Sequence, residues 1–149
     1  MTTQTNSQIA ERLSSKRARI LPVLAVIFIA QQASYFSGTH DPVRTVAQVK
    51  IAAWLVLSAV LLAILGTGGA WFRSKEVREL VNDEATREHR RTGLVAGFWA
   101  ASIAAIALYA IDMFDPMSAR QAVHLILTAS IATALVVFGR LERRAHRDA

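Results

Sequence analysis

The stretch IAAWLVLSAVLLAILGTGGAWF, residues 51–72, decides the fold class because it contains no charged side chain. A helix needs about 20 apolar residues to cross a bilayer, and this stretch is long enough. In lipid the backbone N–H and C=O groups must pair within the segment, so the stretch predicts a membrane-spanning helix. Three further apolar stretches lie before and after it. The four predicted spans are Ile20–Phe36, Val46–Phe72, Gly93–Phe114 and Gln121–Gly139.

The distribution of charge supports this class and predicts an orientation. Hydrophobic residues make up 53% of the chain and charged residues 19%, yet the charges lie mainly between and beside the spans, which favours an integral membrane protein over a soluble bundle. Lys and Arg are concentrated in residues 1–19, 73–92 and 140–149. The positive-inside rule therefore places both termini and the central loop on the cytoplasmic side of the membrane. We expect this membrane to be a bacterial inner membrane.

These observations predict an all-α protein that crosses the membrane four times. A basic arm (residues 1–19) precedes a single four-helix membrane domain (20–139), and a basic tail (140–149) follows it. Within the domain, residues 73–92 are expected to form a cytoplasmic helical elbow. The net charge of +6 is placed at membrane borders, so we expect contact with anionic lipid headgroups and no direct binding of nucleic acid.

The two halves of the chain align with each other when one is shifted by 74 positions. This alignment predicts two tandem helical hairpins related by a parallel internal repeat, and two independent turns made of common turn residues are the alternative. Proline is favoured in the first turn of a helix and aspartate before it, so each Asp-Pro pair is expected to start a returning span. The matched positions are Arg17 with Arg91, Tyr35 with Tyr109, Asp41-Pro42 with Asp115-Pro116, and Lys50 with His124.

Small residues mark one face of the third span. Gly93 and Gly97 have GxxxG spacing, and Ala101 and Ala105 continue the same face. Helices in lipid associate where their backbones can approach closely, so this face predicts helix packing. It can serve the monomer or a homodimer, and the sequence does not separate the two.

The central loop between residues 73 and 91 is rich in both charge signs and contains no proline or glycine. We expect a helical elbow whose acidic and apolar side chains dock a cytoplasmic protein, and a solvated elbow without a partner is the alternative. The candidate partner-binding residues are Glu76, Glu79, Leu80, Val81, Asp83, Glu84 and Glu88.

Four polar residues near the outer border of the spans form a second candidate site. Lys50 and His124 are expected at matched depth, and Gln31 and Gln32 are the most polar pair of the first span. Together they predict a ligand site near the outer face. Snorkelling of Lys50 and ordinary hydrogen bonds between helices explain the same residues without a ligand.

The sequence offers little support for catalysis. There is no cysteine, so thiol catalysis and iron–sulfur clusters are excluded, and no hydrolase or zinc-protease motif is present. A haem held by two histidines inside the membrane is not favoured, because His124 alone lies within a predicted span. We therefore expect a protein that is not an enzyme and that needs no cofactor or metal.

One pattern resembles a known group of proteins. Val81-Asn82-Asp83-Glu84, Arg90-Arg91 and Gly97-Phe98-Trp99 are similar to a pattern in small, uncharacterised bacterial four-span membrane proteins, which are often encoded beside short helix-turn-helix regulators. The resemblance covers the loop and the third span. It implies a membrane partner or antagonist of a DNA-binding protein. Together with the charged loop, it leads us to expect a non-enzymatic membrane regulator or scaffold that holds such a protein. A small transporter or ligand-binding bundle with a site near the outer face is the alternative function.

Overall fold

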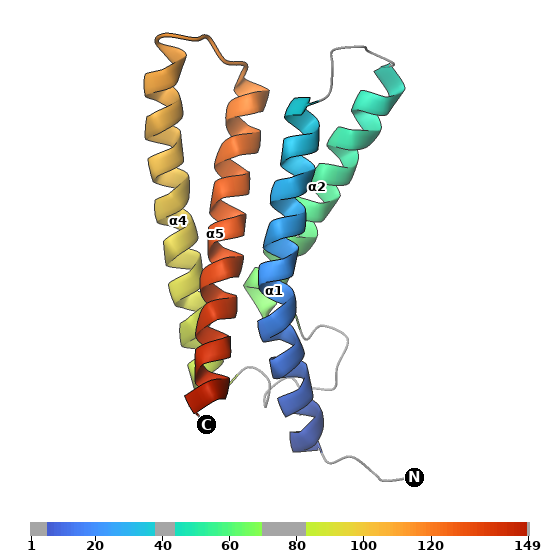
Figure 1. Ribbon diagram of the computed structural model, residues 1–149, viewed down its shortest axis with the longest axis vertical. Coiled ribbons are helices and arrows are strands. Elements are labelled where there is room, and N and C mark those ends of the chain that lie inside the picture. The colour runs from blue at the N-terminus through green and yellow to red at the C-terminus, as the bar shows by residue number, and fades with distance from the viewer. Residues whose placement is uncertain (1–5, 38–43, 70–82, 149) are drawn as a thin grey trace.

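The computed structural model describes residues 6–37, 44–69 and 83–148, and these residues form α-helices joined by short turns, without strands (Figure 1). The helices run alternately up and down, so α1 begins and α5 ends at the same end of the bundle. We call this the basal end and the opposite one the distal end. The helices are α1 (Asn6–Ser37), α2 (Arg44–Thr67), α4 (Glu84–Asp112) and α5 (Ala119–Asp148).

Three of the described helices are long and apolar enough to cross a membrane. They are the segment Gln48–Thr67 of α2, the whole of α4, and the segment Ala119–Arg147 of α5. The predicted span Ile20–Phe36 lies within α1, but the side chains of residues 34–37 are outside the described part, so that span stays a prediction.

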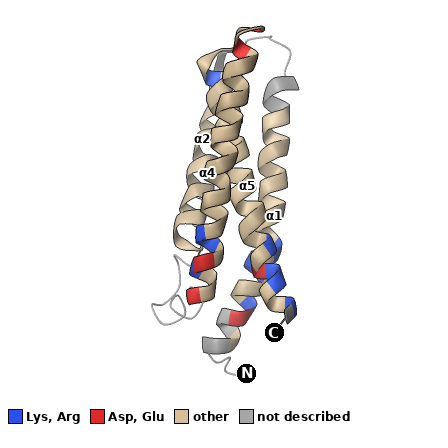
Figure 2. Ribbon diagram, turned by 90° about the vertical axis from the view of Figure 1, so that its left-hand side faces the viewer, with Lys and Arg blue, Asp and Glu red and all other residues tan. Residues whose placement is uncertain are grey.

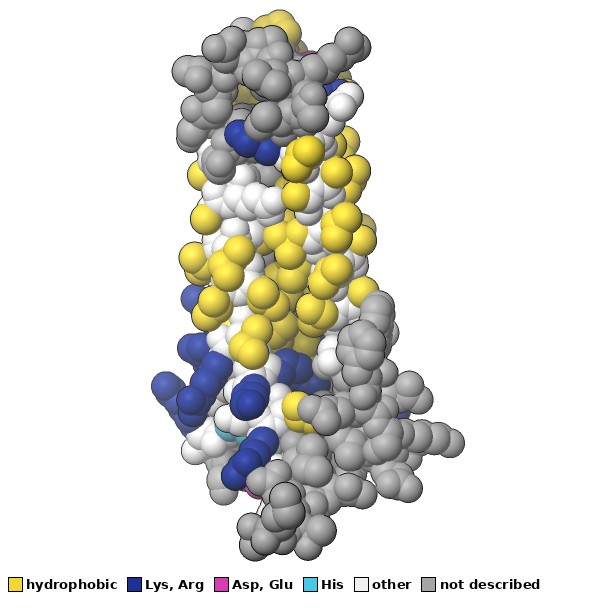
Figure 3. All heavy atoms as spheres, turned by 90° about the vertical axis from the view of Figure 1, so that its right-hand side faces the viewer, with side chains coloured by type: hydrophobic (Ala, Val, Ile, Leu, Met, Phe, Trp, Pro, Cys, Tyr) yellow, Lys and Arg dark blue, Asp and Glu magenta, His cyan; other side chains and the backbone are white. Residues whose placement is uncertain are grey.

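The surface of the bundle is apolar between its two ends. Large hydrophobic side chains such as Phe98, Ile103 and Ile106 on α4 are more than half exposed. Figure 3 shows this apolar belt on one face, bounded on the basal side by Lys and Arg side chains. Figure 2 shows that most Lys and Arg of the described helices gather at the basal end. This surface suits a helix bundle surrounded by lipid.

Helix α5 lies at the centre of the bundle. It packs along α4 on one side and along α1 on the other, whereas α2 approaches α5 and α1 less closely (Figure 1). Buried side chains recur at about one per turn between Arg17 and Gln32 of α1, Trp54 and Leu65 of α2, and His124 and Glu142 of α5, so these three helices share one apolar seam. The seam contains Leu21, Ala25, Phe28, Trp54, Leu61, Leu65, Ile131, Leu135 and Phe138.

The two halves of the chain do not pack equivalently. A twofold relation pairs α1 with α4 and α2 with α5, yet α4 and α5 pack closely while α1 and α2 do not. The matched residues also differ in environment: Arg17 is buried and Arg91 is exposed. The described packing therefore does not show the symmetry that the repeat predicts.

Helix α2 ends at Thr67, beside the glycines near the end of the predicted second span, and residues 70–72 of that span lie outside the described part of the chain. Gly68 and Gly69 have φ of 74° and 76°, and the N–H of Gly68 donates to the carbonyl of Ile64 at 2.8 Å. Left-handed backbone of this kind is open to glycine without steric cost and terminates a helix.

The predicted role of Asp115-Pro116 was wrong, because α5 begins only at Ala119. Ser118 and Gln121 form a capping box. The Ser118 Oγ accepts from the N–H of Gln121 at 3.3 Å, and the Gln121 Oε1 accepts from the N–H of Ser118 at 3.0 Å. This reciprocal pair satisfies two N–H groups at the helix start. The other pair, Asp41-Pro42, lies outside the described residues.

The glycines predicted to pack in α4 face α5 within the same chain. A Cβ added at Gly93 would lie 2.9 Å from the carbonyl oxygen of Ala134, and one at Gly97 would lie 2.8 Å from that of Ser130. Both approaches are too close for any side chain. Ala101 and Ala105, further along α4, are half-buried.

Helices α1 and α5 meet closely at a proline. Pro22 lies inside α1, and a Cβ added at Gly139 of α5 would lie 2.8 Å from the Pro22 ring. A proline removes one helical N–H, which leaves the carbonyl four residues earlier without its usual donor. That carbonyl belongs to Ala18, and it accepts from Nε of Arg143 at 3.0 Å. The side chain of α5 thus compensates for the proline in α1.

Candidate functional site

A buried charge cluster joins all four described helices at the basal end. We call it the basal charge cluster, and it consists of the side chains of Arg17, Thr86, His89 and Glu142 and the carbonyl of Gly68. Arg17 Nη2 lies 2.6 Å from Glu142 Oε2, and the two side chains are only 8% and 4% exposed. Arg17 Nη1 donates to the Gly68 carbonyl at 3.2 Å, just after the end of α2.

Helix α4 contributes two side chains to the cluster, Thr86 and His89, from its first two turns. Thr86 Oγ accepts from Arg17 Nη2 at 3.1 Å and donates to Glu142 Oε1 at 3.1 Å. His89 Nδ1 lies 3.3 Å from the same carboxylate oxygen. Glu142 therefore receives hydrogen bonds on both oxygens, from α1 and from α4.

The neighbours of Arg17 and Glu142 offset the cost of burying these two charges. A buried ion pair is favourable only when its remaining donors and acceptors are also satisfied. Here side chains of α1 and α4 contact the carboxylate, and the guanidinium of Arg17 also lies 5.3 Å from the ring centroid of Phe138. Because the partners come from different helices, the cluster fixes how the helices meet at this end.

A second polar group lies in the distal half of the seam between α1, α2 and α5. His124 is 3% exposed, its Nδ1 lies 3.3 Å from Gln32 Oε1, and its ring stacks on Trp54 with centroids 3.9 Å apart. One turn toward the basal end, Ser58 and Thr128 are also buried. We call these five residues the distal polar layer.

The structure brings together only part of the outer-face site predicted from the sequence. Gln32 and His124 are in contact, as described above. Lys50 is exposed on α2, and the amide oxygen of Gln31 is buried without a hydrogen-bond partner among the described residues. Lys50 and His124 therefore do not form a matched pair, because one side chain faces outward and the other faces the seam.

The predicted partner-binding residues are described in part. Glu76, Glu79, Leu80 and Val81 lie outside the described residues. Asp83 is the N-cap of α4, and its Oδ1 accepts from the N–H of Thr86 at 2.8 Å. Glu84 and Glu88 are exposed in the first two turns, and Glu88 lies 3.8 Å from Arg91. Figure 2 shows acidic residues at the basal end of α4, among mainly basic neighbours.

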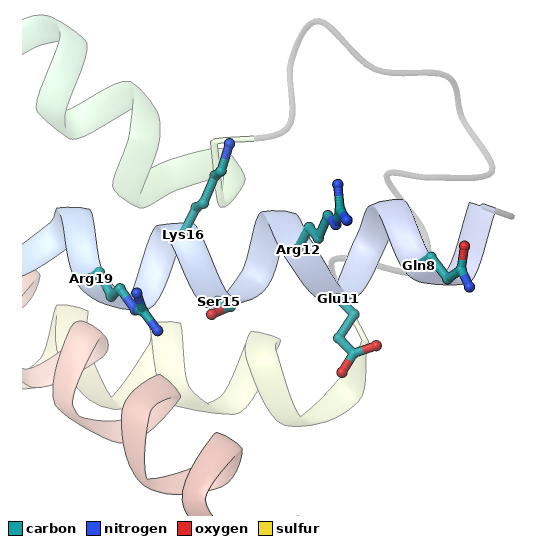
Figure 4. Close-up of a pocket in the computed structure, with 6 residues that line it drawn as sticks. All are labelled: Gln8, Glu11, Arg12, Ser15, Lys16 and Arg19. Atoms are coloured by element: carbon teal, nitrogen blue, oxygen red, sulfur yellow. The ribbon is translucent and has the colours of Figure 1, made fainter. Parts of the chain in front are cut away.

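An open hollow of about 660 Å³ lies beside the first half of α1. Its described lining comes from α1 alone, and Figure 4 shows Arg12 and Lys16 projecting away from Glu11 and Arg19. Because these side chains diverge, they do not converge on one ligand. The other lining residues are Gln8 and Ser15.

Sequence reasoning missed most residues of these two groups, and Glu142 and Trp54 illustrate why. Glu142 was not singled out, although it is the one acidic residue between Asp115 and Asp148 and stands among arginines. A carboxylate isolated in a basic segment is a signal for an ion pair. Trp54 was treated as part of an apolar run, and nothing in its local sequence indicates that it stacks on His124.

Within the described ranges, no group of three or more His, Asp or Glu side chains is placed to hold a metal ion. The comparisons with known proteins found no matching family model, no matching curated protein and no matching solved structure.

Proposed function

We propose that the chain is a non-enzymatic integral membrane regulator or scaffold that binds a cytoplasmic protein at the basal end of α4. The observation that carries this proposal is the position of Glu84 and Glu88. They are exposed carboxylates on the two turns of α4 that also supply Thr86 and His89 to the basal charge cluster. A partner held by these acids would contact the first two turns of α4, whose Thr86 and His89 bond to Arg17 of α1 and Glu142 of α5.

The chemistry of the partner follows from the charge at this place. Glu84 and Glu88 are acidic side chains among mainly basic neighbours, so they are the groups at the start of α4 that a basic protein surface can bind, and the resemblance seen in the sequence points to a DNA-binding regulator. Such a partner uses the same basic surface for DNA phosphate, so membrane binding and DNA binding compete. Binding of this electrostatic kind weakens as salt is added.

The basal charge cluster supports a regulatory role as well as a docking role. A partner that pulls on the first turns of α4 acts on Thr86 and His89, and through Glu142 on Arg17 of α1. Docking at one helix can thereby change the relative positions of the others. A coupling of this kind requires that the partner prefer one arrangement of the cluster.

The experiment is capture of partner proteins from native membranes with the detergent-solubilised chain, using Glu84→Lys/Glu88→Lys as the test variant. Asp83 stays intact because it caps α4. Glu11→Lys is the matched control, since Glu11 is also exposed at the basal end but lies on α1. We expect the test variant to lose a stoichiometric partner and the control to keep it.

A captured partner should also leave the chain when DNA or about 0.5 M salt is added, as expected for screened charges. Equal capture by the original chain and by Glu84→Lys/Glu88→Lys refutes docking at α4. Circular dichroism of both variants verifies that the helices remain formed.

The proposal includes four spans in a bacterial inner membrane, with both chain ends and the α2–α4 connection on its cytoplasmic side. The three apolar helices and the basic residues at the basal end support this orientation. The proposed duplication of a helical hairpin rests on the aligned sequence positions. Anionic lipid headgroups are the expected neighbours of the basal arginines.

A small transporter or ligand-binding bundle is the second candidate function. The observation that favours it is the contact between His124 and Gln32, because the seam buries two polar side chains at the depth of the membrane. Uptake of a ligand by proteoliposomes that is lost in His124→Leu tests this candidate. Lys50 is not required, since it faces outward.

A further inference from the structure

The distal polar layer contains polar atoms that its own residues leave unsatisfied. Among the described residues, no hydrogen-bond partner exists for Trp54 Nε1, Ser58 Oγ, Thr128 Oγ1 or Gln32 Nε2. All four side chains are more than nine-tenths buried. In the apolar part of a membrane protein an unsatisfied polar group is costly, so several in one layer require an explanation.

These atoms belong to a single region of the seam. The Trp54 ring stacks on His124, and His124 contacts Gln32. Ser58 and Thr128 lie one helical turn from Trp54 and His124 on the same buried faces of α2 and α5. Phe28, one turn from Gln32, stacks on Trp54 with centroids 6.4 Å apart, and both rings belong to the apolar seam.

The chemistry of the unsatisfied atoms defines what they can bind. An indole N–H and an amide NH₂ donate hydrogen bonds and do not accept them, while hydroxyls can do both. Gln32 already directs its oxygen at His124. The Trp54 N–H and the Gln32 NH₂ require acceptors, and the hydroxyls of Ser58 and Thr128 can also donate, so an oxygen atom with free lone pairs is a group that all four atoms can bind.

We infer that the distal polar layer binds a small neutral oxygen acceptor, supplied by water or by the carbonyl group of a membrane-soluble molecule. Trp54, Ser58 and Thr128 donate to it. The Trp54 and His124 rings are in direct contact, with centroids 3.9 Å apart, so no ligand lies between them. The inference goes beyond partner docking at α4 and holds whether or not docking occurs.

The first test uses the sign of a stability change in the full chain in nanodiscs. Removing a hydroxyl that has no partner is neutral or stabilising, whereas removing one that binds an acceptor is destabilising. We expect Thr128→Val and Ser58→Ala to lower the unfolding temperature by several degrees. Thr133→Val is the control, because Thr133 lies on the same helix outside the layer and should change little.

The second test identifies the source of the oxygen atom. The indole N–H signal of Trp54, assigned by its loss in Trp54→Phe, should exchange magnetisation with water if water is bound. If a carbonyl compound is bound instead, solvent extraction followed by mass spectrometry should release it stoichiometrically from the original chain and not from Thr128→Val. Either result supports the inference. Unfolding temperatures that rise or stay unchanged in Thr128→Val and Ser58→Ala, with neither water exchange nor a released compound, overturn it.

Discussion

Replacing Arg17 with methionine tests whether the basal charge cluster holds the bundle together. The substitution keeps an apolar stem of similar length but removes the charge that lies 2.6 Å from Glu142 Oε2. The Glu142 carboxylate is 4% exposed, so it would remain buried with Thr86 and His89 as its described donors. Removing one partner of a buried pair in this way costs about 3–5 kcal/mol.

The structure places the expected cost near the lower end of that range. His89 Nδ1 lies 3.3 Å from Glu142 Oε1 and Thr86 donates to the same oxygen, so the carboxylate keeps two described neighbours after Arg17 is replaced. The contact between Arg17 and the Phe138 ring is lost at the same time. We expect Arg17→Met to destabilise the bundle by about 3 kcal/mol, which reduces the folding equilibrium constant by about a hundredfold.

The assay is reversible unfolding in mixed micelles with increasing SDS, followed by circular dichroism. The chain offers a matched control in Arg91, the position that the internal repeat aligns with Arg17. Arg91 pairs with Glu88 at 3.8 Å, but these side chains are 79% and 64% exposed. An exposed pair contributes about 0.5 kcal/mol or less, so Arg91→Met should change stability little.

A double variant separates the buried charge from ordinary packing. Arg17→Met/Glu142→Met replaces the whole pair with apolar side chains, and such replacements are often neutral or stabilising. We expect it to recover most of the stability lost in Arg17→Met. The reasoning is refuted if Arg17→Met costs no more stability than Arg91→Met. It is also refuted if the double variant loses as much stability as Arg17→Met and Glu142→Met lose together when each is measured alone.

The remaining predictions concern packing, hydrogen bonding and orientation. Gly97→Ala should destabilise the same unfolding transition by about 1–3 kcal/mol, since its Cβ would lie 2.8 Å from an α5 carbonyl, whereas Gly66→Ala should be neutral or stabilising because nothing lies within 4 Å. A stable Gly97→Ala would contradict the close packing of α4 on α5. Thr86→Val should cost about 1.5–3 kcal/mol through loss of its hydrogen bond to a buried carboxylate, and an effect within 0.5 kcal/mol, roughly the level of surface changes, would argue against that bond. The chain contains no native cysteine, so single cysteines report orientation cleanly. A membrane-impermeant maleimide should label Ala119→Cys on intact spheroplasts and Ala145→Cys only after permeabilisation, and the reverse pattern would invert the proposed topology.

The sequence predicted those features that depend on neighbouring residues of one segment. The helix that contains residues 51–66 follows from its length and apolar character, because each backbone group of a membrane helix pairs within the same helix. The packing face of Gly93 and Gly97 follows from their spacing on one side of a helix. Local signals failed where two of them competed. Asp115-Pro116 and the Ser118 capping box lie close together, and the reciprocal hydrogen bonds of the capping box determine where α5 starts.

The tertiary structure decided which distant residues meet. Arg17 and Glu142 are separated by 125 positions, and the sequence places both among many basic residues at one membrane border. Only the packing of α1 against the central helix α5 buries this arginine and leaves Arg91 exposed. The same holds for His124, which could have faced lipid beside Lys50 and instead faces Trp54 and Gln32. Local sequence determines that a helix spans the membrane, because its backbone bonds are internal. Its rotation and its neighbours depend on close contacts between helices, and no single segment encodes them.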